Sequence, residues 1–156
     1  MRHAVFDKFE LRFEAMQVEH LDAVAALEQL AYAHPWQRKH FSDSLVSGYQ
    51  TQLLMANHLL LGYFVAMKGF EEVHLLNLAV SPGYQKQGLA HIMLDALALW
   101  ARGHGAHCVW LEVRAGNLRA RQVYAANGFR QAGLRRGYYP AEQGQREDAI
   151  VMSLPL

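Results

Sequence analysis

Apolar residues recur along this chain with two periods, one typical of strands and one typical of amphipathic helices. Short alternating or continuous apolar runs predict strands at 11–16, 51–56, 60–67, 73–80, 107–113, 131–138 and 148–154. Apolar residues three and four positions apart predict helices at 22–32, 37–46, 88–104 and 117–127. Residues 1–8 have neither pattern, so we expect a loose N-terminal tail followed by a single domain at 9–156.

The clearest helical pattern lies at 88–104, between the strands at 73–80 and 107–113. Two strands joined by one crossover helix are expected to be parallel neighbours. The remaining strands follow one another with short turns and are expected to be antiparallel. The predicted fold class is therefore α/β, with a mixed, mostly antiparallel sheet, helices on both faces and one parallel strand–helix–strand unit.

Composition narrows the class of protein. Among the 156 residues 52% are apolar and 19% charged, which fits a folded domain and excludes a disordered chain. The net charge of +1 lacks the basic excess of a nucleic-acid binder. Cys108 is the only cysteine, and the longest apolar run, 59–67, is too short to span a membrane. We therefore expect a cytoplasmic protein without a nucleic-acid or membrane partner, and we expect it to be a monomer.

The turn before the helix at 88–104 reads Gln85-Lys86-Gln87-Gly88-Leu89-Ala90. A helix start leaves backbone N–H groups without acceptors and carries a partial positive charge. A glycine there lets a phosphate approach the backbone closely. An ordinary strand-to-helix turn, in which Gly88 only relieves crowding, is the alternative. The strand before it and the amphipathic helix after it favour phosphate binding.

The Gln85-x-x-Gly88-x-Ala90 spacing resembles the pyrophosphate-binding signature of the GCN5-related N-acetyltransferases, and the resemblance extends over about 11–156. It implies that acetyl-coenzyme A is the cosubstrate and that no metal takes part. The residues implied to bind the pyrophosphate region are Gln85, Lys86, Gln87, Gly88, Leu89, Ala90 and His91. The residues whose backbone is implied to bond the pantetheine arm are Leu78, Ala79 and Val80.

Glu112 lies inside a predicted strand, in the run Trp110-Leu-Glu-Val-Arg114. Alternation places it on the face opposite the apolar residues of that strand. Burying an unpaired charge is costly, so an ion pair with Arg114 or another arginine, or a position at the rim, would also explain it. The segment resembles that of the RimI-type ribosomal-protein N-acetyltransferases, and this resemblance implies that Glu112 is the general base.

Asn117 and Tyr124 lie seven residues apart on one short predicted helix, and two turns bring them to the same face, roughly 10 Å apart along the axis. Asn117 also suits the N-cap position, and Tyr124 also suits a half-buried core position. The pattern Asn117-x-x-Ala120-x-x-x-Tyr124 resembles the same family. The resemblance implies that both residues contact the cofactor and that Tyr124 protonates the departing thiolate.

Three aromatic residues are implied, less specifically, to line the acceptor side: Trp36, Tyr138 and Tyr139. Two adjacent tyrosines at a strand end are also common as plain packing. The cluster His104-x-x-His107-Cys108 offers three metal-binding side chains, whereas a structural zinc site needs four ligands, so chance is the favoured explanation.

The resemblance implies an acetyl-CoA-dependent acetyltransferase of protein N-terminal α-amines, with the N-terminal alanine of a small-subunit ribosomal protein as acceptor. A carboxylate is a weak base, and an α-amine suits such a base because it loses its proton more easily than a lysine amine does. At pH 7 freeing a neutral α-amine costs about 1 kcal/mol, whereas freeing a lysine amine costs about 4.6 kcal/mol. Two alternatives stay open: an acetyltransferase of small amines such as polyamines or antibiotics, and a non-catalytic acyl-CoA-binding sensor.

Overall fold

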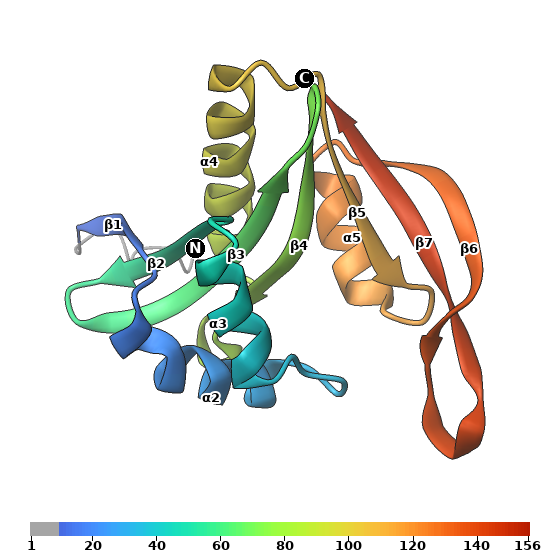
Figure 1. The fold of residues 1–156 in the computed structure, drawn as a ribbon, viewed down its shortest axis with the longest axis horizontal. Coiled ribbons are helices and arrows are strands. Elements are labelled where there is room, and N and C mark those ends of the chain that lie inside the picture. Colours follow the sequence, from blue (N-terminus) through green and yellow to red (C-terminus); the bar gives the residue numbers. More distant parts are fainter. Residues whose placement is uncertain (1–9) are drawn as a thin grey trace. The chain divides into compact units, whose positions relative to one another are not determined.

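The computed structural model describes residues 10–156, so the predicted tail at 1–8 lies outside the described residues. The elements, in chain order, are β1 (Leu11–Ala15), α2 (Leu21–Ala31), α3 (Arg38–Val46), β2 (Gln50–Ala56), β3 (Leu59–Lys68), β4 (Glu72–Val80), α4 (Leu89–Gly103), β5 (Cys108–Arg114), α5 (Leu118–Ala126), β6 (Arg130–Pro140) and β7 (Arg146–Pro155) (Figure 1). All predicted strands and helices are present. Their ends differ from the prediction by at most two residues, as at the end of β6 and the start of β7.

The described residues divide into two compact units, one formed by the residues up to Met67 with Asn77–Met93, and the other by Lys68–Leu76 with Leu94–Leu156. The strand order is β1-β2-β3-β4 in the first unit and β4-β5-β7-β6 in the second, because β4 contributes to both. β4 and β5 are parallel, whereas the pairs β1–β2, β2–β3, β5–β7 and β6–β7 are antiparallel. This arrangement confirms the predicted fold class and its strand–helix–strand unit.

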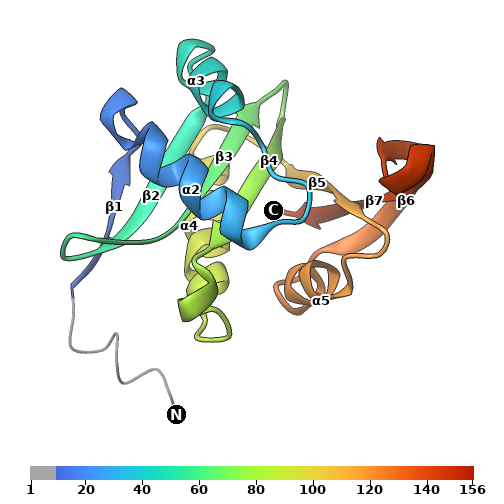
Figure 2. The ribbon, with the colours of Figure 1, turned by 90° about the horizontal axis from the view of Figure 1, so that it is seen from below.

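Two neighbouring residues of β3 show that the first unit has helices on both faces. Tyr63 donates a hydrogen bond to Glu28 of α2 at 2.7 Å. A Cβ on Gly62 would lie 2.4 Å from the carbonyl oxygen of Ala79 and 3.0 Å from the side chain of Met93 in α4. Because successive strand residues face opposite sides, α2 and the first turn of α4 cover opposite faces (Figure 2). Gly62 is required because the backbone of β4 leaves no room for a side chain.

In the second unit, β5 has one apolar face. The buried residues of that face are Val109, Leu111 and Val113. Gly128, at a φ of +93°, follows α5 in the left-handed conformation of a helix cap, and a Cβ there would lie 3.1 Å from Leu154 of β7. Since Leu154 pairs directly with Val109, the end of α5 lies on this apolar face. Glu112 projects from the opposite face of β5.

Glu28 is a buried carboxylate with only 2% of its surface exposed. It accepts hydrogen bonds from Tyr63 at 2.7 Å, from Asn77 at 3.1 and 3.2 Å, and from the backbone N–H of Trp36 at 2.9 Å. The Trp36 ring packs on Phe41 with centroids 5.1 Å apart. Glu28 therefore ties the loop between α2 and α3 to the sheet of its own unit.

Replacing Glu28 with leucine should lower the free energy of unfolding by about 3 kcal/mol or more. The change leaves the buried hydroxyl of Tyr63 and two part-buried donors, from Asn77 and Trp36, without an acceptor. A buried donor left without a partner costs about 1–3 kcal/mol. Urea denaturation followed by circular dichroism measures the effect. Glu19→Leu, at an exposed position, is the matched control. Equal losses in the two variants would contradict a structural role for the buried carboxylate.

Candidate active site

The segment between β4 and α4 has the backbone shape that the phosphate-loop prediction requires. Gly88 adopts a φ of +84°, a conformation that suits glycine, and its carbonyl accepts from the N–H of Ile92 at 3.2 Å to open α4. Lys86 also has a positive φ, +64°. The side chain of Gln85 donates to the carbonyl of Val80 at 3.2 Å and holds the loop to the end of β4. The start of a helix is in general a place where backbone N–H groups can bind an anion.

Two carbonyls at the end of β4 already receive donors from this chain. The hydroxyl of Tyr32, just after α2, donates to the carbonyl of Leu78, and Gln85 donates to that of Val80. The apolar pattern could not reveal either bond, because both join residues whose partners depend on the tertiary fold. These contacts fix the backbone of Leu78, Ala79 and Val80, the stretch predicted to meet the pantetheine arm.

Glu112 is held by three side chains from two other strands, β4 and β6. Its carboxylate lies 3.3 Å from Nε2 of His74 and 2.6 Å from Nε of Arg135, and the hydroxyl of Tyr138 hydrogen-bonds to it. The Glu112 side chain is 10% exposed, whereas that of Arg135 is 48% exposed. An arginine partner was one of the predicted explanations for Glu112, and the partner is Arg135 rather than the neighbouring Arg114.

His74 was missed by the sequence analysis. It pairs with Trp110 in the parallel register of β4 and β5, and the two rings stack with centroids 3.7 Å apart at an angle of 10°. The indole of Trp110 in turn donates to Glu72 at 2.7 Å. Alternation with the buried residues Val73 and Leu75 could have placed His74 on the polar face. Its neighbour across the sheet could not be found without the register.

Burial and the Glu112 charge together set the ionisation of this cluster. Burial lowers the pKa of His74 below its usual 6.5 despite the opposing effect of Glu112, so the imidazole is neutral at pH 7. Burial first, and then Glu112, raises the pKa of Tyr138 and raises that of Tyr139 to about 12. At neutral pH Glu112 therefore faces one cation, Arg135, and two neutral groups, His74 and Tyr138.

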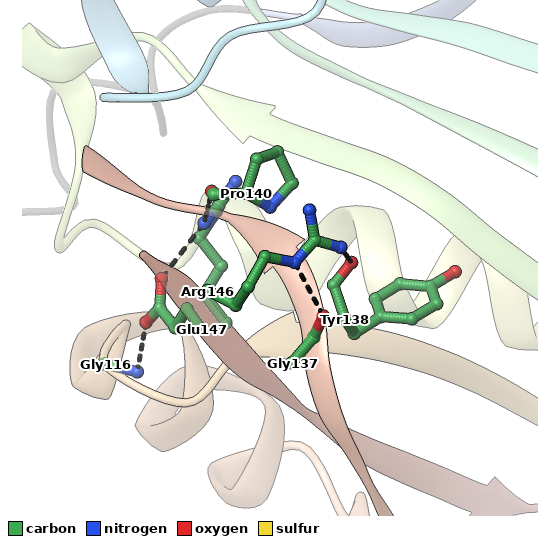
Figure 3. A network of polar contacts seen from close by, with 7 residues as sticks. Gly116, Gly137, Tyr138, Pro140, Arg146 and Glu147 are labelled. Atoms are coloured by element: carbon green, nitrogen blue, oxygen red, sulfur yellow. Dashed lines mark hydrogen bonds and ion pairs between the residues drawn. The ribbon is translucent and has the colours of Figure 1, made fainter. Parts of the chain in front are cut away.

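The hairpin of β6 and β7 holds Tyr138 by its backbone. Gly137, at a φ of +56°, lies where the register of β6 against β7 shifts. Arg146 donates to the carbonyls of Gly137 at 2.9 Å and Tyr138 at 3.1 Å (Figure 3). Asp148 accepts from the N–H of Gly137 at 2.8 Å. The bulge at Gly137 thus presents the Tyr138 side chain from a fixed backbone.

Tyr139 is packed by a second network on the same hairpin. The guanidinium of Arg114 lies 4.4 Å from the centre of its ring. Arg114 also donates to Glu147 at 3.0 Å and to the carbonyl of Pro140 at 2.9 Å, and Glu147 accepts from the N–H of Gly116 at 2.8 Å (Figure 3). This network joins the end of β5 to the base of the hairpin, and it provides the partners of the Arg114 guanidinium.

The helix α5 carries the other predicted cofactor residues. The side-chain oxygen of Asn117 accepts from the N–H of Ala120 at 3.2 Å, which confirms the predicted N-cap. Tyr124 is 9% exposed and its ring lies 5.6 Å from that of Phe129. Burial, and then the neighbouring Tyr139, raises the pKa of Tyr124. The Tyr124 hydroxyl is therefore protonated at neutral pH, the form a proton donor needs.

Within residues 10–156 no group of three or more His, Cys, Asp or Glu side chains could hold a metal ion. His104 faces the carbonyl of Trp100 at 2.9 Å, and His107 faces Glu71 at 3.8 Å. In the same range no helix has the length and apolar character needed to cross a membrane.

The model of the acetyltransferase (GNAT) family matches residues 17–129. The chain belongs to this family. Among GNAT proteins it is 37% identical over 142 residues to the enzyme named "[Ribosomal protein bS18]-alanine N-acetyltransferase" of Escherichia coli (strain K12). That match covers 91% of this chain and 95% of the relative.

Solved structures of GNAT proteins agree with the fold. The crystal structure of the ribosomal-protein-S18-alanine N-acetyltransferase from Escherichia coli superimposes with a TM-score of 0.84 at 36% identity, covering 94% of each chain. A GNAT acetyltransferase from Elizabethkingia anophelis, solved with acetyl-CoA bound, gives a TM-score of 0.75 at 21% identity and covers 94% of this chain and 98% of its own. At that identity the second structure shares the GNAT fold.

Proposed function

We propose that this GNAT protein is an acetyl-CoA-dependent N-terminal acetyltransferase whose acceptor is the N-terminal alanine of ribosomal protein bS18. The observation that carries the proposal is the 37% identity, over 91% of the chain, to an Escherichia coli enzyme named for that reaction. The proposal includes a monomeric enzyme of the cytoplasm that needs neither metal nor nucleic acid. A near-neutral charge of +1 supports the last point.

The loop before α4 supports the cosubstrate assignment. A positive-φ glycine next to the start of a helix of 15 residues is a backbone arrangement that accepts a phosphate. In the proposal the N–H groups from Gln85 to Ala90, with His91, hold the pyrophosphate, and the backbone of 78–80 meets the pantetheine arm. Acetyl-CoA supplies the acetyl thioester. Asn117 contributes a further cofactor contact from the start of α5.

The proposed reaction is direct transfer. The neutral α-amine attacks the thioester carbon, a C–N bond forms, and the C–S bond breaks. Glu112 takes the proton that the amine loses, and Tyr124 donates a proton to the departing sulfur. The acceptor's ammonium group first replaces the guanidinium of Arg135 at the carboxylate, which the 48% exposure of Arg135 permits. It releases one proton to solvent, and the resulting neutral amine is the species that attacks. Trp36, Tyr138 and Tyr139 line the acceptor side.

The acceptor is tested by incubating the purified protein with acetyl-CoA and peptides that differ only at their first residue. We expect release of free thiol to be fastest with the bS18 N-terminal peptide that begins with alanine, and mass spectrometry to locate the acetyl group on its α-amine. A lysine side-chain product, or faster transfer to spermidine, would overturn the proposed acceptor. Coenzyme A binding without transfer to any amine would indicate a sensor.

Gly88→Val should weaken coenzyme A binding by about 10–100-fold. A β-branched residue at a φ of +84° is strained by about 1–3 kcal/mol, and its side chain occupies the space intended for phosphate. Titration calorimetry measures the affinity. Gly83→Val is the matched control in the same loop, since no atom lies within 4 Å of a Cβ placed there. Normal affinity in a folded Gly88→Val protein would contradict the loop assignment.

Glu112→Gln should lower kcat by roughly 10²–10⁴, the usual contribution of a general base, with little change in coenzyme A affinity. The amide keeps the shape of the side chain and accepts no proton. Thiol release with the alanine peptide measures kcat, and calorimetry measures affinity. Glu142→Gln, at an exposed position, is the control. Unchanged turnover from pH 6 to 9 would remove Glu112 from the mechanism.

A further inference from the structure

Four side chains alternate between β4 and β5 along one face of the second unit: Glu72, Trp110, His74 and Glu112. Glu72 accepts from the Trp110 indole at 2.7 Å, and Trp110 stacks on His74 with centroids 3.7 Å apart. Nε2 of His74 then lies 3.3 Å from the Glu112 carboxylate. Each side chain in the row contacts the next one, and the last of them is Glu112, the proposed base.

This row limits the freedom of the imidazole. One face of the ring lies against the near-parallel indole, at an angle of 10°, and this stack fixes the direction in which the edge of the ring points. That edge meets Oε1 of Glu112, while Arg135 meets Oε2. His74 is 15% exposed and Arg135 is 48% exposed. Of the two donors, Arg135 is the one that an incoming cation can displace, and His74 is the one that stays.

We propose that His74 is a positioning residue for Glu112. Its neutral imidazole donates Nε2–H to Oε1 and holds the carboxylate in place, while Oε2 passes from Arg135 to the acceptor amine. This inference rests on the proposed function of Glu112 as the base. It assigns a role to a side chain of β4, whereas the other proposed contact of that strand, with the pantetheine arm, is made by backbone groups.

The charges that face His74 give the role a pH dependence. They are Glu72 on its own strand, Glu112 on β5 and Arg135 on β6, and Trp110 covers the ring face. Because burial lowers the His74 pKa, the ring is neutral at pH 7 and becomes an imidazolium only below its usual 6.5. An imidazolium stabilises the charged carboxylate and makes it a poorer proton acceptor. Activity that depends on neutral His74 is therefore present at neutral pH and is lost as the pH falls.

The experiment compares His74→Ala and His74→Gln with the wild type, using acetyl-CoA and the alanine peptide. His74→Ala should lower kcat about tenfold, in keeping with the loss of one hydrogen bond to a charged group, with unchanged coenzyme A affinity. His74→Gln should recover most of kcat, because its amide donates the same bond. His107→Gln is the matched control, since His107 faces Glu71 at 3.8 Å but is 76% exposed. Wild-type kcat in His74→Ala would overturn the proposal.

The pH profile separates positioning from packing. The ratio of kcat/KM for the wild type to that for His74→Gln cancels the ionisation of the peptide. We expect the ratio to be flat above pH 7 and to fall below pH 6.5, because only the wild type forms an imidazolium. A ratio that stays constant from pH 5 to 8 would overturn the proposal.

A measurement that does not require acetyl transfer tests this inference separately from the proposed function. Titration of the His74 ring proton by NMR should give a lower pKa in Glu112→Gln than in the wild type, because the carboxylate opposes the effect of burial. If the wild type transfers acetyl to no peptide, the proposed function fails, and the NMR titration still decides the contact. An unchanged His74 pKa in Glu112→Gln would show that the two side chains do not interact and would overturn the positioning role.

Discussion

The cost of keeping a carboxylate in the middle of a strand organises the second unit. Glu112 is 10% exposed, and the donors that offset its desolvation come from β4 and β6, on either side of β5 and β7. Arg135 can reach it only by crossing β7. The residue of β7 that lies between Arg135 and β5 in the register is Ala149, which is fully buried. The small side chain of Ala149 leaves room for the Arg135 guanidinium to reach Glu112. The charge on β5 thus offers a physical reason for an alanine at this position of β7.

Two carboxylates with little exposed surface, Glu28 and Glu112, differ in the kind of partner that surrounds them. Glu28 is surrounded by neutral donors from its own unit, and none of them is a mobile ion. Its bonds join a helix, a strand and a loop, so loss of any partner has a structural cost. Glu112 is balanced by a cation that is half-exposed, and such a partner exchanges with another cation at small cost. The distinction between the carboxylate that anchors and the one proposed to react thus lies in the partner, since both have little exposed surface.

The order of strands and helices followed from the apolar pattern, and so did the strand–helix–strand unit. Alternation also placed Glu112 on the face away from Val113. The sequence did not reveal its partners, because alternation assigns a face and leaves the register between distant strands undetermined. Register decides that His74 lies opposite Trp110, and the bulge at Gly137 decides which residue of β6 faces Glu112. Arg114, the nearer arginine along the chain, is taken by Glu147, a partner that only the antiparallel pairing of β5 and β7 brings close.

The proposed use of a carboxylate as the base bears on which amine the site suits. A glutamic acid ordinarily has a pKa of about 4.3, far below that of an alkyl ammonium, so carboxylates as a class are weak bases toward amines. Such a base suits an amine that is nearly neutral already. The α-amine of a peptide ordinarily has a pKa of about 7.7–8.0, whereas lysine and other alkyl amines lie near 10.4, a difference of about 3.5 kcal/mol in the free energy of deprotonation at neutral pH. Recognition of a peptide N-terminus therefore agrees with a carboxylate as the proposed base as well as with the likeness to a protein N-terminal acetyltransferase.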